Sequence, residues 1–311
     1  MNKHAITLIL LAASAVSASA QGRILPVTEM PVSAEALAAG NAMHSSTDTY
    51  IYADPALAFG SESRWHAVYS AALLPSNDGT HSLHTLSAAA RFGSNAVFVG
   101  ARYHDMGTMK TFVDNDMNET QHGSMSLSAY TVDAGYARLL TPNIAAWATA
   151  GLASEKTSTT IFAVRMALGA DYSGIASLAG KPLSYSAGLS ASNLGRYSYT
   201  GKSGMLSPRV GIGGHAVWQT AEGQSLALTV DGGMYMKTDD TKQSAELSGG
   251  IAYTAFSNYT LRIGGHTGDK DDYAAAGFSI AMKWITLHAT AKIPLRNNLD
   301  AVYMAGLAVN L

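Results

Sequence analysis

The stretch "IFAVRMALGADY" at residues 161–172 alternates between apolar residues and polar or small ones. A period of two residues is the signature of a β-strand whose two faces meet different surroundings. Arg165 and Asp171 fall on one face of this strand. The pattern predicts an apolar environment on one side and a wet or charge-pairing environment on the other. The apolar face consists of Phe162, Val164, Met166, Leu168, Ala170 and Tyr172.

The composition of the chain points to a membrane as the apolar environment. Of 311 residues, 47% are hydrophobic and only 14% are charged, whereas a soluble domain has roughly 25% charged residues. Beyond the first 20 residues, no segment has the long apolar run of a transmembrane helix. Since only helices and closed barrels satisfy every backbone group in hydrocarbon, we expect a β-barrel. The net charge of -2 argues against a nucleic-acid partner.

Residues 1–20 have the order of a secretory signal peptide. Lys3 precedes the apolar run "AITLILLAASAV", and "ASA" precedes Gln21. The run is shorter than the roughly 20 residues of a membrane span, which disfavours a membrane anchor. We therefore expect export through the Sec pathway, a mature chain beginning at Gln21, and a location in the outer membrane. The chain has no cysteine, which excludes disulfides, thiolate metal sites and a cysteine-linked lipid.

The mature chain can be divided into about fourteen alternating segments of roughly ten residues, the length of a tilted barrel strand. Long and short connections between them alternate, as in bacterial barrels with short periplasmic turns and long outer loops. The longest predicted outer loops cover residues 104–126 and 193–208, whereas "SGIASLAGKP" at 173–182 is long for an inner turn. A soluble sandwich would have no reason to sort its loops in this way. The segments begin near residues 65, 83, 95, 127, 143, 160, 183, 207, 224, 243, 258, 273, 285 and 300.

We therefore predict an all-β fold, a transmembrane antiparallel barrel of about 14 strands, with charged residues facing its lumen. An arginine on the lipid face would cost about 2–4 kcal/mol at mid-membrane. The candidate polar residues of the lumen are Arg102, Asp133, Arg165, Asp171, Arg209, Asp231, Arg262 and His266.

Aromatic residues and glycine pairs add two further expectations. Trp65, Trp147, Trp218 and Trp284 lie near strand ends, which suits the aromatic girdles of a barrel, although ordinary core aromatics are the alternative. Glycine pairs inside strands usually mark a bulge or a close approach of another segment. We expect them either to let a segment lie against the wall or to form a lateral gap. The pairs are Gly213–Gly214, Gly232–Gly233, Gly249–Gly250 and Gly264–Gly265.

Residues 21–64 do not have the barrel pattern. They contain the helix-prone "SAEALAAG" and a turn at Asp54 and Pro55. Their apolar residues must be buried away from water, and the lumen of a 14-stranded barrel is wide enough to hold such a segment. We expect this segment to be a short hatch in the lumen.

The order "GNAMHSSTDTYIYADPALA" followed by a barrel resembles the FadL-like outer-membrane proteins. Asp54 departs from the asparagine that is usual in that hatch pattern. Within the superfamily, "SNLG" at 192–195, residues 261–284 and the ending "IPLRNNLDAVYMAGLAVNL" are similar to the PorV/PorQ branch of the Bacteroidetes, and most similar to its PorV-like members. The resemblance implies a signal peptide at 1–20, a hatch at 21–64 and a barrel at 65–311. The residues on the hatch motif are Gly40, Asn41, Asp48, Asp54, Pro55 and Ala56.

The resemblance leaves three alternatives for the function. PorV-like proteins act in type IX secretion, where they receive cargo with a C-terminal sorting domain and deliver it to the surface. FadL-like proteins instead take up fatty acids or other hydrophobic compounds, and a purely structural barrel is a third alternative. Implied partners are outer-membrane lipid and lipopolysaccharide, together with sorting-domain cargo and other secretion components, or a hydrophobic small molecule.

No pattern in the sequence predicts an enzyme, a cofactor or a metal site. The alternation of the strands places four histidines on the lumen face: His66, His215, His266 and His288. No His-Glu-x-x-His or Gly-x-Ser-x-Gly motif accompanies them. We expect them to line the lumen. The outer-loop residues Asp269, Asp271 and Asp272 suggest calcium but lack the closing glutamate of a calcium loop. A solvated loop, or a lipopolysaccharide contact bridged by a divalent cation, is the preferred interpretation.

Overall fold

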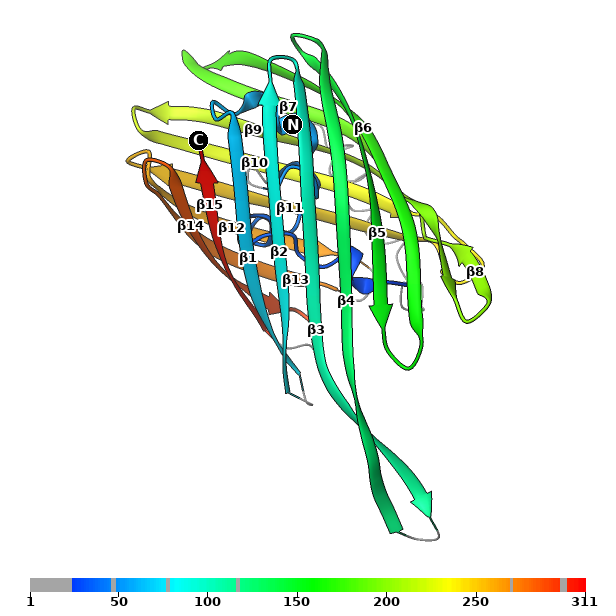
Figure 1. The fold of residues 1–311 in the computed structure, drawn as a ribbon. Helices are drawn as coiled ribbons and strands as arrows, with labels where there is room; N and C mark the ends of the chain where they lie inside the picture. Colours follow the sequence, from blue (N-terminus) through cyan, green and yellow to red (C-terminus); the bar gives the residue numbers. More distant parts are fainter. Residues whose placement is uncertain (1–23, 46–48, 77–78, 116–117, 269–270, 297–300) are drawn as a thin grey trace, which may run out of the picture.

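Fourteen antiparallel strands form a closed barrel in the computed structural model, which describes residues 24–45, 49–76, 79–115, 118–268, 271–296 and 301–311 (Figure 1). The barrel closes because β1 pairs with β15 and β6 pairs with β7, which in turn pairs with β9. A short additional strand, β8, pairs with the end of β7. The predicted fold class and strand number are confirmed.

The strands differ more in length than the sequence pattern predicts. The strands are β1 (Trp65–Ser76), β2 (Gly79–Phe92), β3 (Asn95–Asn115), β4 (Asn118–Thr141), β5 (Ile144–Lys156), β6 (Thr160–Leu178), β7 (Lys181–Tyr199), β8 (Lys202–Met205), β9 (Arg209–Ala221), β10 (Gln224–Tyr235), β11 (Ser244–Ala255), β12 (Tyr259–Thr267), β13 (Tyr273–Ala281), β14 (Ile285–Pro294) and β15 (Val302–Asn310).

Strand β6 has the two faces that its alternation predicts. Phe162, Val164, Met166, Leu168 and Tyr172 are each between 41% and 51% exposed, while the Asp171 side chain is buried on the opposite face. The outer surface of the barrel carries exposed leucine, valine, isoleucine and aromatic side chains on strand after strand. An apolar band of this kind is what lipid would cover.

The connections β2–β3, β4–β5, β6–β7, β9–β10, β11–β12 and β13–β14 are two or three residues long and lie at one end of the barrel, which we call the turn end. The chain ends there too, since Arg64 and Trp65 donate their backbone N–H groups to the Leu311 carbonyl. The "SGIASLAGKP" connection is much shorter than predicted, because β6 and β7 continue into it and leave only residues 179–180 as the turn.

The prediction of a loop at 104–126 is wrong, because β3 and β4 continue through it as a paired hairpin. Pairing reaches Asn115 and Asn118, with register shifts after Asp105 and after Thr111. The hairpin projects well past the other strands, at the end opposite the turn end (Figure 1). We call this opposite end the hairpin end. The predicted 193–208 loop is likewise partly strand, as β7 and β8 pair within it.

Residues 24–45 and 49–60 lie inside the barrel and contain four short helices (Figure 1). Helix α2 packs against β12, β13, β14 and β15. Ser33 caps α2 by accepting a hydrogen bond from the Ala36 backbone N–H, and Asp54 caps η3 by accepting one from Ala56. Within the described residues, no helix is long and apolar enough to cross a membrane. The helices are η1 (Pro26–Thr28), α2 (Ala34–Ala38), η2 (Met43–Ser45) and η3 (Pro55–Gly60).

Glycines in the wall make room for this N-terminal segment. A Cβ on Gly264 would lie 2.5 Å from the Ala39 carbonyl carbon, and one on Gly250 would lie 2.8 Å from the Ala39 Cα. Gly40, with a φ of 76°, lies against the backbone of Gly265. The expectation that glycines let a segment lie against the wall is confirmed here. The alternative of a wall gap is wrong for β11 and β12, since they pair continuously through their glycines.

Candidate functional site

His44 of η2 is the centre of a buried polar cluster in the lumen. Its Nδ1 lies 3.3 Å from Asp231 Oδ2 on β10, and its Nε2 lies 3.2 Å from Asp171 Oδ1 on β6. Asp54 Oδ2 lies 3.8 Å from the same Nε2. The His44 side chain is 3% exposed. The cluster thus joins the N-terminal segment to two strands of the wall, β6 and β10, which are separated by β7 and β9.

Hydrogen bonds from other side chains hold the carboxylates of Asp171 and Asp231 in place. Arg209 NH2 donates to Asp231 Oδ1 at 2.6 Å, and Arg209 Nε donates to Glu246 Oε1 at 2.5 Å. Trp147 Nε1 donates to Asp171 Oδ2 at 2.9 Å. These side chains all point into the lumen, and their hydrogen bonds fix the orientation of Asp171 and Asp231.

The charge state of the cluster follows from these contacts. Burial by itself would lower the pKa of His44, but hydrogen bonds to Asp171 and Asp231 and the charge of Asp54 raise it to about 10. The ring is therefore an imidazolium at neutral pH, which lets each nitrogen donate to a carboxylate. Burial and the nearby charge of Asp171 raise the pKa of Asp54 to about 8. Both shifts are consequences of enclosing several carboxylates in one dry space.

Two further arginines of the wall hold the N-terminal segment. Arg102 NH1 donates to the backbone carbonyls of Val27, Thr28 and Met30 at 3.1–3.3 Å. The Arg102 guanidinium also lies 4.0 Å from the ring centroid of Tyr52. On the far side, Arg262 NH2 donates to Glu35 Oε1 of α2 at 2.5 Å. These contacts are polar and directional, so they define one position of the segment.

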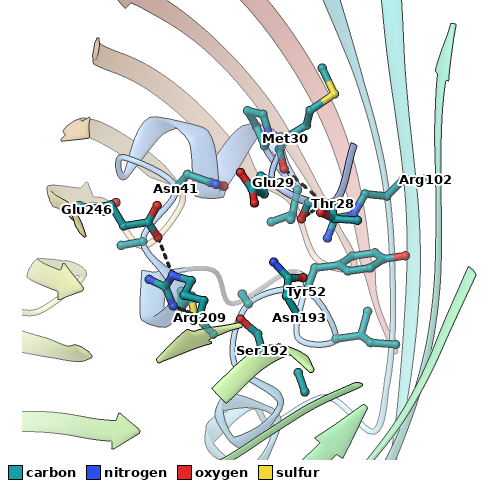
Figure 2. A pocket seen from close by; sticks show the side chains of 18 of the residues that line it. Thr28, Glu29, Met30, Asn41, Tyr52, Arg102, Ser192, Asn193, Arg209 and Glu246 are labelled. Atoms are coloured by element: carbon teal, nitrogen blue, oxygen red, sulfur yellow. Dashed lines mark hydrogen bonds and ion pairs between the residues drawn. The ribbon is translucent and has the colours of Figure 1, made fainter. Parts of the chain in front are cut away.

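The N-terminal segment separates two cavities. The cavity on the hairpin-end side has a volume of about 240 Å³ and is lined by both polar and apolar groups, with Arg102 and Arg209 among the polar ones (Figure 2). The cavity on the turn-end side is larger, at about 920 Å³, and combines apolar side chains such as Leu57 and Phe59 with Arg262 and several histidines. Segment residues line both spaces, so the described part of the segment lies between the two cavities.

All eight polar residues predicted for the lumen point inward. Asp171, Arg209 and Asp231 meet around His44, whereas Arg165 pairs separately with Asp133 at 2.8 Å. His266 Nδ1 lies 2.8 Å from Ser248 Oγ on the next strand. The predicted residues therefore fall into several groups and do not form one site.

The other candidate histidines each have a partner on the adjacent strand. His215 contacts Thr229, His288 contacts Ser279 and His66 contacts Asn310, with 2.5–2.9 Å between the polar atoms. They are spread along the wall, as expected for lumen lining. Of the predicted outer-loop acids, Asp271 binds Lys292 at 2.7 Å and Asp272 binds Arg296 at 2.6 Å. Asp269 lies outside the described residues.

The residues on the hatch motif have identifiable structural roles. Gly40 and Asn41 both adopt positive φ angles, 76° and 56°, at the end of α2. Pro55 begins η3 directly after the Asp54 cap, and Ala56 lines the larger cavity. Asp48 lies outside the described residues.

The sequence did not predict that His44, Glu35 or Trp147 takes part in the polar contacts of the lumen. His44 belongs to a segment without periodicity, and its partners are 127 and 187 positions away. The girdle prediction is wrong for Trp147, which is 7% exposed and faces the lumen. Trp65 and Trp284 are more than half exposed near the turn end, as a girdle requires.

No family model matches the sequence, and no curated protein matches it. Among solved structures, the chain is similar to the Pseudomonas putida toluene transporter TodX, with a TM-score of 0.59 and 11% identity, covering 90% of this chain and 98% of TodX. It is also similar to a Pseudomonas aeruginosa FadL homologue, with a TM-score of 0.51 and 10% identity, covering 93% and 100%. This chain has the fold of the FadL-like barrels. The names of these structures give no support to the PorV/PorQ branch.

Proposed function

We propose that this protein is an outer-membrane channel that admits small hydrophobic compounds. The fold is shared with TodX, which is described as a toluene transporter and a monoaromatic hydrocarbon channel. Channel and transporter neighbours also favour a role without enzymatic chemistry. The apolar outer surface supports the location in the outer membrane.

The observation that carries the proposal is the larger cavity. Its volume of about 920 Å³ is at the upper end of the 300–1,000 Å³ that is usual for sites of small molecules. Leu57, Phe59 and Val217 give it apolar surface, and the N-terminal segment forms its inner boundary. A compound entering from the hairpin end would have to displace part of this segment, which therefore acts as the hatch.

Uptake of radiolabelled toluene tests the proposal. The protein is expressed in an outer membrane that lacks its own channels for hydrophobic compounds, and uptake is compared with that of an empty-vector strain. Ala281→Trp fills the cavity from β13, whereas Ala276→Trp on the same strand faces outward and is the matched control. We expect the channel to raise uptake, Ala281→Trp to abolish the increase and Ala276→Trp to keep it. Equal uptake with and without the protein would overturn the proposal.

A secretion role is the second candidate, and the projecting β3–β4 hairpin favours it. A paired hairpin that extends past all its neighbours offers a surface for a protein partner (Figure 1). In this role the partners would be sorting-domain cargo and other secretion components. Surface and periplasmic proteins should be compared between the wild type and a deletion strain. Loss of sorting-domain proteins from the surface supports secretion, and an unchanged surface proteome rejects it.

Export and orientation complete the proposal. The signal peptide at residues 1–20 lies outside the described residues, and its removal predicts a mature protein beginning at Gln21. The turn end then faces the periplasm, while the hairpin end and Asp271 and Asp272 face lipopolysaccharide. Mass spectrometry of the N-terminal peptide from purified outer membranes tests the cleavage site.

A further inference from the structure

We propose that His44, Asp54 and Asp171 form a binding site for a first-row divalent cation such as Zn²⁺. Each residue offers one ligand atom, and the three atoms lie within 4.8 Å of one another. The candidate ligands are His44 Nε2, Asp54 Oδ2 and Asp171 Oδ1. One imidazole nitrogen with carboxylate oxygens is a donor set that suits zinc and its neighbours better than the all-oxygen shell of calcium.

The spacing of these atoms suits a single ion. Zinc bonds to nitrogen and oxygen of about 2.0–2.1 Å place the ligands of a tetrahedral site about 3.3 Å apart. His44 Nε2 lies 3.2 Å from Asp171 Oδ1 and 3.8 Å from Asp54 Oδ2. The third separation, between Asp54 Oδ2 and Asp171 Oδ1, is at most 4.8 Å, so an ion that replaced the proton of Nε2 would draw these two oxygens together by about 1.5 Å at most. The fourth position would be left to water.

Each ligand is held by a hydrogen bond to its other polar atom. Asp231 Oδ2 accepts from His44 Nδ1 at 3.3 Å, so Nε2 is the nitrogen that remains for an ion. The Trp147 indole donates to Asp171 Oδ2, and the Ala56 backbone N–H donates to Asp54 Oδ1, both at 2.9 Å. Outer partners of this kind orient the ligands of metal sites, with carboxylate–histidine–metal as the commonest form.

An unpartnered carboxylate oxygen points independently to a ligand. Asp54 is 1% exposed, and its Oδ2 has no hydrogen-bond partner among the described residues. A buried polar atom without a partner costs about 1–3 kcal/mol and more when charged. A divalent cation would give this oxygen a partner.

Glycines in the wall leave space for the His44 imidazole, and the larger cavity gives a metal ion access to it. A Cβ on Gly213 would lie 2.6 Å from Asp231 Oδ2, and one on Gly188 would lie 2.7 Å from His44 Nε2. Asp54 and Asp171 both line the larger cavity, which gives an ion access from the turn end. Because two ligands belong to the N-terminal segment and the third to β6, a bound ion would fasten the segment to the wall. This site is independent of which compound or cargo the barrel handles.

Zinc binding to the full-length protein tests the proposal. The protein is purified in detergent, treated with a chelator and dialysed, and then titrated with Zn²⁺ in a calorimeter. We expect one high-affinity site per chain in the wild type, and loss of that site in Asp54→Asn and His44→Gln. Asp231→Asn should weaken binding 10–100-fold, as for other groups that orient a ligand. His215→Gln and Asp133→Asn are controls, because they change a lumen histidine and a lumen carboxylate outside the site.

A second measurement needs no variant. X-ray absorption at the zinc edge of the wild-type protein should show nitrogen and oxygen ligands at about 2.0–2.1 Å and one histidine. Circular dichroism checks that each variant retains its β structure. Equal zinc binding in wild type, Asp54→Asn and His44→Gln, or a zinc edge with several histidines, would mean that only adventitious surface sites bind and would overturn the proposal.

Discussion

Arg262 of β12 donates a hydrogen bond to Glu35 of α2 over 2.5 Å, although the two residues are 227 positions apart in the chain. Their side chains are 14% and 4% exposed. Removing one partner of a buried ion pair costs about 3–5 kcal/mol, because the other charge stays buried alone. This pair is therefore a main anchor of the N-terminal segment.

Glu35→Ala should loosen the N-terminal segment without opening the barrel. We expect backbone amides of α2 to exchange at least tenfold faster in hydrogen–deuterium exchange, while the strands keep their protection. Glu62→Ala is the control, since Glu62 is exposed at the turn end. Unchanged exchange of α2 in Glu35→Ala would show that the ion pair does not anchor the helix.

Gly264→Ala should displace the segment, whereas Gly265→Ala on the same strand should not. The added Cβ of Gly264→Ala would lie 2.5 Å from backbone atoms of Ala39 and Gly40, while that of Gly265→Ala meets only the Tyr273 carbonyl oxygen at 3.4 Å. We expect a measurable rise in single-channel conductance in planar bilayers for the first variant. Equal conductance for the two variants would contradict the close approach of segment and wall.

Arginine on the lipid face should destabilise the barrel according to its depth. Leu168 lies in the middle of β6 and is 50% exposed, whereas Leu178 is the last residue of β6 beside the turn. We expect Leu168→Arg to lower the free energy of unfolding by about 2–4 kcal/mol and Leu178→Arg by about 0–1 kcal/mol. Urea unfolding in lipid vesicles measures both. A similar cost at the two positions would place this face outside the hydrocarbon.

Trp147→Phe should weaken the hold on Asp171. The substitution keeps an aromatic ring but removes the 2.9 Å hydrogen bond to Asp171 Oδ2. Since hydrogen bonds to charged groups contribute about 1.5–3 kcal/mol, we expect a loss of unfolding free energy in this range. Trp284→Phe removes an exposed tryptophan and is the control. If both variants unfold at the same urea concentration, the indole N–H does not support the cluster.

Much of the barrel could be predicted from the sequence, because strand alternation is a local property. A residue such as Arg165 faces the lumen whatever its distant neighbours are, since its place in a period of two already determines its face. The hairpin at 104–126 escaped prediction for a related reason. Its polar residues resemble a loop, but backbone pairing between β3 and β4 does not require an apolar face.

The sequence by itself determined the alternation of faces, the sorting of connections and the presence of a segment that is not barrel wall. Only the tertiary structure decided which charges meet. His44, Asp54, Asp171 and Asp231 are brought together because β7 and β9 place β6 near β10 and the N-terminal segment packs against these strands from inside the barrel. The alternation within one strand cannot specify contacts between residues on different strands, because these contacts depend on the register of every strand between the partners.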